Sequence, residues 1–293
     1  MSALRVSGLR KRYGKTRALD GLDLEIPKGV ICGMVGPNGA GKTTTFGIIG
    51  GLIRPDEGEV DVLGKGPFEA SVHRGRITLM PQDCELPPST PVAKALTFYA
   101  RLQGLTRHEA DGEVARVLDA VNLQDRAGSR IAQLSHGMRR RVQVAQALLG
   151  SPELVLLDEP TSGLDPEQTA RMREVFLAER GRRTLVVSSH ILSELEAVCD
   201  MVAVMQAGRC VRFGSLAELT ERKGEVRIRV RGETPPIEGA ERDGEWLVVR
   251  GEEPAALNAR VLPLLLAAEV DILEVRQGRS LESSYLDMER DKS

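Results

Sequence analysis

The fold of this chain is decided by one short stretch, Gly36-Pro37-Asn38-Gly39-Ala40-Gly41-Lys42-Thr43. It matches the pattern G-x-x-x-x-G-K-[ST] without substitution, between an apolar run at 30–35 that predicts a strand and a helix predicted to begin near Gly41. Glycines let backbone N–H groups approach phosphate oxygens closely, and a helix N-terminus adds the positive end of its dipole. Lys42 supplies a cation for the β- and γ-phosphates, and the Thr43 hydroxyl is a Mg²⁺ ligand. The stretch therefore predicts a nucleotide-binding cradle, to which we add Thr44, in preference to an accidental glycine turn.

Two further predicted strand ends carry side chains suited to the same nucleotide. The apolar run at 154–157 ends in Asp158, which fits a Mg²⁺ role through water, and Glu159, which would orient and deprotonate the attacking water. The strand predicted at 184–188 leads to His190, whose imidazole can donate a hydrogen bond to the γ-phosphate. Solvated acids in a turn and an isolated imidazole are the alternatives, and the presence of the cradle favours catalytic roles.

The spacing of apolar residues divides the chain into regions of different architecture. Short strands between glycine turns are predicted at 4–9, 22–26, 30–35, 59–63 and 77–80. Helical spacing predicts a helical insert at about 87–150, with Ser135 capping its third helix. Continuously apolar strands then alternate with helices at 166–180 and 191–198, which is typical of a parallel sheet covered on both faces. After about residue 220, strands at 225–231, 246–250 and 270–275 and helices at 258–268 and 281–288 predict a separate α+β module.

The composition excludes several classes of function. The chain has 293 residues, with 40 Lys and Arg against 42 Asp and Glu, so it has no overall basic field to collect nucleic-acid phosphates. Aromatic residues make up only 3%, which leaves few platforms for stacked bases. The strongest apolar stretch, at 261–268, is far shorter than the ~20 residues of a membrane span, and the N-terminus lacks the apolar region of a signal peptide. We therefore expect a soluble intracellular protein, without a nucleic-acid partner, that serves a membrane only through other subunits.

The cysteines and histidines do not form a metal-binding pattern. Cys32, Cys84, Cys199 and Cys210 stand singly, without a C-x-x-C pair or zinc-like spacing, and the four histidines are scattered. We expect reduced thiols that pack as small apolar side chains.

An ordered set of motifs resembles the ATP-binding-cassette (ABC) ATPases over about residues 3–215. The set comprises the cradle, Gln82 after a strand, Leu134-Ser135-His136-Gly137-Met138-Arg139-Arg140-Arg141, the acidic strand end, Ser162-Gly163-Leu164-Asp165 and His190. The resemblance implies an α/β fold: a P-loop NTPase core with an antiparallel β subdomain and a helical insert, plus the small C-terminal α+β module. The corresponding domains are 1–220, with the helical part inserted, and 221–293.

The resemblance also implies roles for individual residues. Tyr13 matches the aromatic that stacks on adenine, although a half-buried tyrosine at a strand edge is the alternative. Gln82 matches the glutamine that senses Mg²⁺ and the γ-phosphate, and Asp165 matches the loop that communicates between two sites. Ser135 and Gly137 match the signature motif, which caps the ATP held by the opposite subunit through a helix N-terminus and a hydroxyl.

The signature departs from its commonest form at two positions. His136 replaces a glycine and Met138 replaces a glutamine, which bears on the contacts to phosphate and on the turnover rate. The arginines at 139–141 invite an RNA or membrane contact, but we expect a helix whose arginines meet acidic side chains of a partner and water.

A chain with one cradle and one signature needs a second chain to complete each ATP site. The resemblance therefore implies a head-to-tail dimer with ATP and Mg²⁺, either a homodimer or a heterodimer. It also implies integral-membrane permease subunits that meet residues 83–101, and a cytoplasmic location on the inner face of the membrane.

The subfamily that the chain resembles most is the drug, lipid or polysaccharide exporter (ABC-2) type. This resemblance includes Phe98-Tyr99-Ala100-Arg101 and the C-terminal Leu281-Glu282-Ser283-Ser284-Tyr285-Leu286. An importer ATPase, a non-transport cassette of ribosome-associated or regulatory type, and a cassette that hydrolyses ATP poorly are the alternatives. For the C-terminal module, a dimer contact, regulation and a stabilising cap all remain open.

Overall fold

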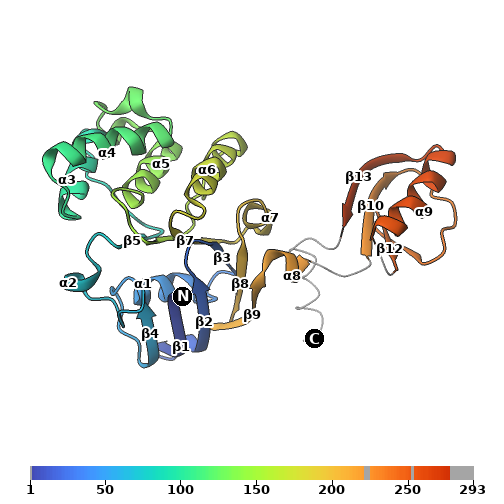
Figure 1. The fold of residues 1–293 in the computed structure, drawn as a ribbon, viewed down its shortest axis with the longest axis horizontal. Coiled ribbons are helices and arrows are strands. Elements are labelled where there is room, and N and C mark those ends of the chain that lie inside the picture. The colour runs from blue at the N-terminus through green and yellow to red at the C-terminus, as the bar shows by residue number, and fades with distance from the viewer. Residues whose placement is uncertain (1, 221–224, 252–253, 278–293) are drawn as a thin grey trace. The chain divides into compact units, whose positions relative to one another are not determined.

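The computed structural model describes residues 2–220, 225–251 and 254–277, and Figure 1 shows their arrangement. The chain forms two compact units, Met1–Gly214 and Ser215–Ser293. The final helix predicted at 281–288 lies outside the described residues.

A six-stranded sheet forms the centre of the first unit. Its order is β5 (Ile77–Met80), β6 (Leu154–Leu157), β7 (Thr184–Ser189), β3 (Ile31–Val35), β8 (Met201–Gln206) and β9 (Arg209–Ser215). The pairs from β5 to β8 are parallel, and every residue of β6, β7 and β3 is buried. These continuously apolar strands confirm the predicted parallel sheet. Because the strands run in the same direction, the cradle after β3, Asp158 after β6 and His190 after β7 emerge at one edge.

A second, antiparallel sheet packs against the central one. Its order is β2 (Thr16–Pro27), β1 (Ser2–Tyr13) and β4 (Glu57–Val62), and helix α1 (Lys42–Ile49) lies beside it (Figure 1). One apolar cluster joins Leu22 of β2, Phe46 of α1 and Leu156 of β6. The antiparallel sheet is therefore part of the same core, and it packs against α1, the helix that follows the cradle. A short helix, α2 (Ala70–His73), leads from this sheet to β5.

The helical insert contains α3 (Val92–Leu102), α4 (Arg107–Ala120) and α5 (His136–Ala147), with 3₁₀ turns at Gln124–Arg126 and Ile131–Gln133. The three helices pack together on one side of the central sheet (Figure 1). Thr106 and Glu109 form a reciprocal capping box at the start of α4, and the Ser135 Oγ caps α5 by accepting from the Met138 N–H at 3.2 Å. The predicted Ser135 cap is confirmed. Two later helices, α6 (Pro166–Glu179) and α7 (Leu192–Glu196), follow β6 and β7.

The second unit has its own sheet and its own apolar core. After α8 (Leu216–Thr220), the antiparallel order is β11 (Ala240–Asp243), β12 (Trp246–Arg250), β10 (Glu225–Arg231) and β13 (Asp271–Gln277). Helix α9 (Pro254–Ala267) packs against β10 and β13, where Leu257, Val261 and Leu265 meet Val226 and Ile228. The alternating pattern of β10 puts its apolar residues toward α9, as a half-buried strand requires.

All four thiols are free, and burial makes them poor nucleophiles. Cys32 and Cys199 are fully buried, and burial raises the pKa of Cys199 to about 12, with the Asp200 carboxylate adding to the effect. Cys210 is half-buried, and burial raises its pKa to about 11. Burial also raises the pKa values of Cys32 and Cys84.

We predict slow labelling of the native thiols at pH 8 by a thiolate-specific reagent such as iodoacetamide. With a pKa of about 12, Cys199 is thiolate in roughly one molecule in ten thousand at that pH, far below an unfolded cysteine. Mass spectrometry of each cysteine peptide measures the rates, and the guanidinium-denatured chain, in which all four should react quickly, is the control. Labelling of native Cys199 at its denatured rate contradicts the buried placement.

Candidate functional site

The cradle between β3 and α1 is shaped by close backbone approaches that only glycine tolerates. Gly41 has a φ of 104°, and a Cβ there would lie 2.6 Å from the Ala18 carbonyl oxygen of β2. A Cβ at Gly36 would lie 2.2 Å from the Met205 carbonyl oxygen of β8. Both sheets therefore press on the loop, and they hold its backbone in a curve that side chains would break.

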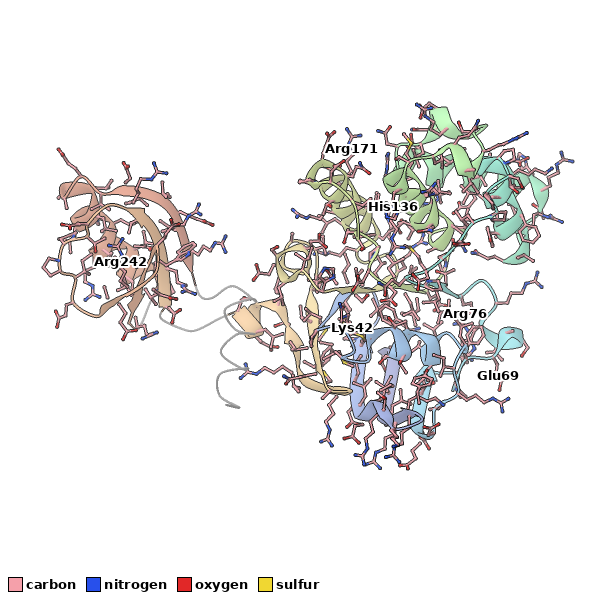
Figure 2. All side chains as sticks on the ribbon, turned by 180° about the vertical axis from the view of Figure 1, so that it is seen from behind. Lys42, Glu69, Arg76, His136, Arg171 and Arg242 are labelled. Carbon is pink, nitrogen blue, oxygen red and sulfur yellow. The ribbon has the colours of Figure 1, made fainter. Side chains whose placement is uncertain are left out.

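Lys42 folds back over this loop. Its Nζ donates to the carbonyl oxygens of Gly36 at 2.6 Å and Pro37 at 3.2 Å, and the residue is only 6% exposed. Burial lowers the pKa of Lys42, and the carboxylates of Glu159 and Asp158 oppose that shift. Figure 2 shows Lys42 within the body of the unit. The ammonium group is thus a buried cation at the loop where an anionic ligand would enter.

The remaining cradle residues differ in exposure. Pro37, Asn38, Gly39 and Thr43 are exposed, Thr44 is half-buried, and Ala40 and Gly41 are buried. The exposed members include Thr43 at the first turn of α1, where a hydroxyl is free to face a ligand in solution.

The acidic strand end is held by Ser188 of β7. Leu157 pairs with Val187, so Asp158 lies beside Ser188, whose Oγ donates to Asp158 Oδ1 at 2.5 Å and accepts from the Glu159 N–H at 2.8 Å. Asp158 is 1% exposed, and its Oδ2 is buried with no hydrogen-bond partner within the described residues. A buried carboxylate oxygen without a donor, close to a threonine-bearing loop, suits Mg²⁺, which prefers oxygen ligands. The residues present therefore fit the predicted metal.

Glu159 and His190 come together from two neighbouring strand ends. His190 Nδ1 lies 3.3 Å from Glu159 Oε1, and the glutamate side chain is 9% exposed while the imidazole is 53% exposed. Glu159 has a φ of 50°, in the left-handed region that a non-glycine residue rarely adopts. The pair thus joins a shielded carboxylate to an imidazole that reaches the surface.

Arg140 of α5 reaches the same two strand ends from the helical insert. Its Nη1 donates to the Gln82 carbonyl oxygen at 2.9 Å, and its Nη2 donates to those of Asp158 at 3.1 Å and Glu159 at 2.5 Å. The Gln82 side chain itself is exposed in the turn after β5. Sequence reasoning missed the roles of Arg140 and Ser188 in holding these strand ends. An arginine or a serine in a sequence does not indicate that its side chain will bind a distant backbone group.

The expectation that the arginines at 139–141 meet water and acidic partners is wrong for two of them. Arg140 and Arg141 are buried, and the Arg141 Nη1 donates to the carbonyl oxygens of Val121 and Asn122 at 2.9 and 3.2 Å. Arg139 is half-buried and donates to the Leu134 carbonyl oxygen. The guanidinium groups donate to main-chain carbonyl oxygens at turns, and a charge run in the sequence does not reveal this.

The start of α5 packs against the loop that contains Asp165. A Cβ at Gly163 would lie 2.8 Å from His136 Nε2, and a Cβ at Gly137 would lie 2.1 Å from Gln168 Oε1. Asp165 caps α6 by accepting from the Gln168 N–H at 2.8 Å, and this bond holds the Asp165 pKa below its usual range. The imidazole that departs from the signature, labelled in Figure 2, thus contacts the 162–165 loop. A side chain at position 137 would require the Gln168 side chain of α6 to move.

Tyr13 lies apart from the buried groups. It ends β1, is 49% exposed, and has the Lys11 Nζ 5.7 Å from its ring centroid. It pairs with Thr16 in the hairpin whose second strand contributes the Ala18 carbonyl next to Gly41. The ring is therefore exposed on the hairpin that borders the cradle.

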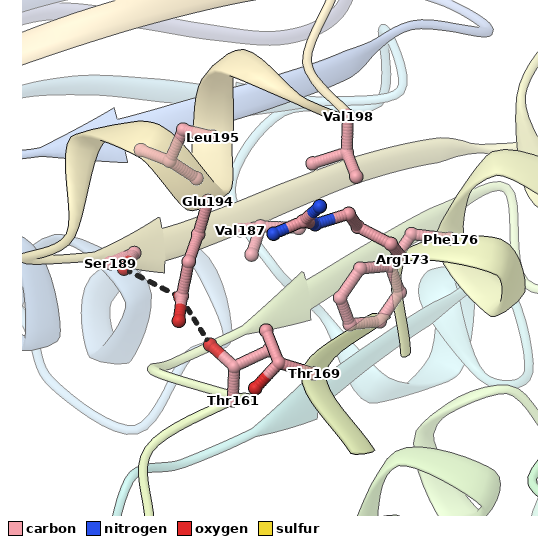
Figure 3. Close-up of a pocket in the computed structure, with 9 residues that line it drawn as sticks. All are labelled: Thr161, Thr169, Arg173, Phe176, Val187, Ser189, Glu194, Leu195 and Val198. Carbon is pink, nitrogen blue, oxygen red and sulfur yellow. Dashed lines mark hydrogen bonds between the residues drawn. The ribbon is translucent and has the colours of Figure 1, made fainter. Parts of the chain in front are cut away.

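A second carboxylate, Glu194 of α7, ties the loop after β6 to the end of β7. Its Oε2 accepts from the Thr161 Oγ1 at 2.6 Å and from the Ser189 Oγ at 3.2 Å (Figure 3). Thr161 lies two residues after Glu159, and Ser189 directly precedes His190. Glu194 therefore adds a second link between the two strand ends that carry Glu159 and His190, besides the contact between Glu159 and His190 themselves.

Comparisons with known proteins show which family this chain resembles. Residues 19–162 match the family model described as "ABC transporter". The linearmycin resistance ATP-binding protein LnrL of Bacillus subtilis is 35% identical over 227 residues, covering 75% of this chain and 72% of that protein. The Nod factor export ATP-binding protein I of Burkholderia pseudomallei is 34% identical over 266 residues, covering 86% of this chain and 87% of that protein. A solved ATP-binding subunit of an ABC transporter superposes with a TM-score of 0.67 at 27% identity, covering 74% of this chain and 92% of its own.

The Glu194 network predicts a measurable loss of stability on Glu194→Ala. The variant leaves the Thr161 and Ser189 hydroxyls without their charged acceptor, so the free energy of unfolding should fall by about 1–3 kcal/mol. Glu194→Gln keeps one carbonyl oxygen as an acceptor and should lose less, and Ser193→Ala, at an exposed position of the same helix, is the control. Denaturant unfolding measures all three, and an unchanged midpoint for Glu194→Ala contradicts the network.

Proposed function

The chain belongs to the family of ABC transporter ATP-binding subunits, and from this membership we propose that it hydrolyses ATP with Mg²⁺ to drive export through separate membrane subunits. The observation that carries the proposal is the meeting of three groups at one edge of the parallel sheet. They are the buried Lys42 cation, the unpartnered Asp158 oxygen and the Glu159–His190 pair.

In the proposed reaction, the cradle binds the triphosphate. The N–H groups of the loop and the start of α1 face the β- and γ-phosphates, and Lys42 exchanges its two carbonyl acceptors for phosphate oxygens. The exposed Tyr13 ring offers a stacking surface for the adenine at the border of the cradle. Thr43, Asp158 and Gln82 are the residues that would hold Mg²⁺, which when bound neutralises charge on the β- and γ-phosphate oxygens.

Glu159 acts as the general base in this proposal. Its carboxylate orients a water molecule and accepts its proton as the oxygen attacks the γ-phosphorus and the bond to the ADP oxygen breaks. His190, 3.3 Å away, then donates a hydrogen bond to the γ-phosphate from the imidazole nitrogen that faces it. The tie through Ser188 keeps the base beside the metal-binding carboxylate.

The proposed working unit contains two ATPase chains. Ser135 caps α5 and Gly137 follows it, so the helix N-terminus offers N–H groups and a hydroxyl to an anion. In a head-to-tail pair these groups cap the ATP held by the cradle of the other chain, and the neighbouring 162–165 loop with Asp165 lies between the two sites. Either a second copy or a closely related chain can supply the opposite half.

The proposed membrane partner is an integral-membrane permease. The chain docks on the cytoplasmic side of this permease. Among the described residues, no helix has both the length and the apolar character to cross a bilayer. Phe98 and Leu102 of α3 are 59% and 54% exposed, and they offer an apolar contact for a permease segment. A hollow of about 500 Å³, lined by residues that include Gln82, Cys84 and Arg139, opens beside the turn after β5.

Export is the direction we favour, because relatives that match most of this chain are named for linearmycin resistance and Nod factor export. For the second unit, which has its own core, we propose an accessory role in contact between chains or in regulation.

The general-base assignment predicts that Glu159→Gln binds ATP but hydrolyses it slowly. The rate should fall by about 10²–10⁴-fold, because the amide cannot accept the water proton. Phosphate release measures turnover, and size-exclusion chromatography with ATP should reveal a trapped dimer. Glu174→Gln, at an exposed position of α6, is the matched control, and parental turnover by Glu159→Gln refutes the assignment.

The two-chain site predicts that Ser135→Ala impairs turnover while sparing ATP binding to the isolated chain. The alanine removes a hydroxyl that faces the other chain's nucleotide, and it also removes a helix cap worth about 1 kcal/mol. Thr106→Ala, which removes the cap of α4, controls for lost stability and should keep its turnover. Nucleotide titration and steady-state hydrolysis separate the effects, and equal loss of binding and turnover refutes the two-chain site.

A further inference from the structure

Arg140 joins three main-chain carbonyl groups that belong to two different motifs. Gln82 follows β5, Asp158 and Glu159 follow β6, and all three carbonyl oxygens accept from this one guanidinium group at 2.5–3.1 Å. Arg140 is the fifth residue of α5, so the donor comes from the helix that Ser135 begins. A single side chain thus connects the start of the signature helix with the two turns that carry the catalytic residues.

The environment of Arg140 is costly for a cation. The residue is 6% exposed, its Nε is buried without a partner, and no carboxylate oxygen forms an ion pair with it within the described part of the chain. Burial lowers the pKa of Arg140, and the nearby carboxylates of Asp158 and Glu159 oppose that shift only in part. A buried charge without an ion pair contributes little to stability that apolar packing would not supply, which points to a role in geometry.

The backbone of Glu159 is where this geometry matters. Its left-handed φ of 50° is strained for a residue with a Cβ and persists only when the surroundings hold it. Ser188 Oγ accepts from the N–H of Glu159 at 2.8 Å, and Arg140 donates to its carbonyl oxygen at 2.5 Å. The residue is therefore held on both sides, and this sets the direction in which its carboxylate leaves the chain toward His190.

We propose that Arg140 is a positioning residue that aims the Glu159 carboxylate and links its aim to the position of α5. The proposal rests on the proposed function, in which Glu159 is the general base. Ser135 lies five residues before Arg140 on the same rigid helix. Engagement of the other chain's nucleotide at Ser135 therefore shifts the guanidinium group, and with it the main chain of Glu159. Cleavage becomes coupled to closure of the two-chain site.

The helix supplies a matched control for this proposal. Arg141 is also buried, also on α5, and also bonded to two carbonyl oxygens, but these belong to Val121 and Asn122, at the end of α4. Arg140→Gln and Arg141→Gln thus remove the same group from the same helix, and only the first removes contacts to the catalytic turns.

We expect Arg140→Gln in the full-length chain to lower kcat for ATP by about 10- to 100-fold, as a misplaced catalytic group does, while KM changes by less than about threefold. Arg141→Gln should lower the unfolding midpoint with kcat changed by less than about twofold, because it leaves the strand ends untouched. Arg140→Lys, which keeps the charge but cannot reach three carbonyls, should fold and should show a reduced kcat with an unchanged KM. This variant keeps the test decisive if Arg140→Gln fails to fold.

A double-mutant cycle separates positioning from a general structural effect. In the Glu159→Gln background, Arg140→Gln should cause little further loss of kcat, because there is no base left to aim. Full additivity in that cycle, or equal kcat losses for Arg140→Gln and Arg141→Gln, overturns the role of Arg140. Parental turnover by Glu159→Gln alone overturns the general-base assignment instead, so the two failures give different results.

Discussion

The structure depends on the parallel pairing of β6, β7 and β3. Parallel strands deliver their carboxyl ends to one edge, so residues separated by more than a hundred positions become neighbours without any local signal between them. The pairing of Leu157 with Val187 puts Asp158 beside Ser188, and the pairing of Val35 with Ser189 puts the cradle beside His190. The grouping of the candidate site residues at one edge therefore follows directly from the register of three fully buried strands.

Around that edge, side chains that are not themselves proposed to react hold the motif residues in place. Ser188, Arg140 and Glu194 bind main-chain groups or hydroxyls of the loops that carry Asp158, Glu159 and His190. These three side chains come from β7, α5 and α7, so the central sheet, the helical insert and the helix after β7 all hold the site. Buried polar groups need partners, and in this site the partners also set the direction of the reacting groups.

In the proposed two-chain assembly, each chain carries half of each site, and the same arrangement supplies both halves. The cradle and the Glu159–His190 pair lie at the sheet, whereas Ser135 and Gly137 lie at the start of α5, packed against the loop that ends at Asp165. Arg140 spans the distance between these two halves within a single chain. In the proposed assembly, a contact made by α5 with another chain would be transmitted through Arg140 to the main chain of Glu159.

The sequence by itself determined the buried strands, the position of the cradle between β3 and α1, and the capped start of α5. These features have local signals, namely unbroken apolar runs, a fixed glycine spacing and a serine before a helix. It did not determine that β1 extends over Ser2–Tyr13, where the run expected at 4–9 continues through bulged antiparallel pairing, or that β11 exists, because its residues are mostly exposed. Nor did it reveal that Arg140 and Arg141 are buried: a charged residue is expected at the surface, and its burial depends on main-chain carbonyl acceptors that only folding brings within reach. Tertiary structure decided these points, because any residue type can supply a main-chain carbonyl acceptor. The sequence around an arginine therefore does not indicate which distant turn it will bind.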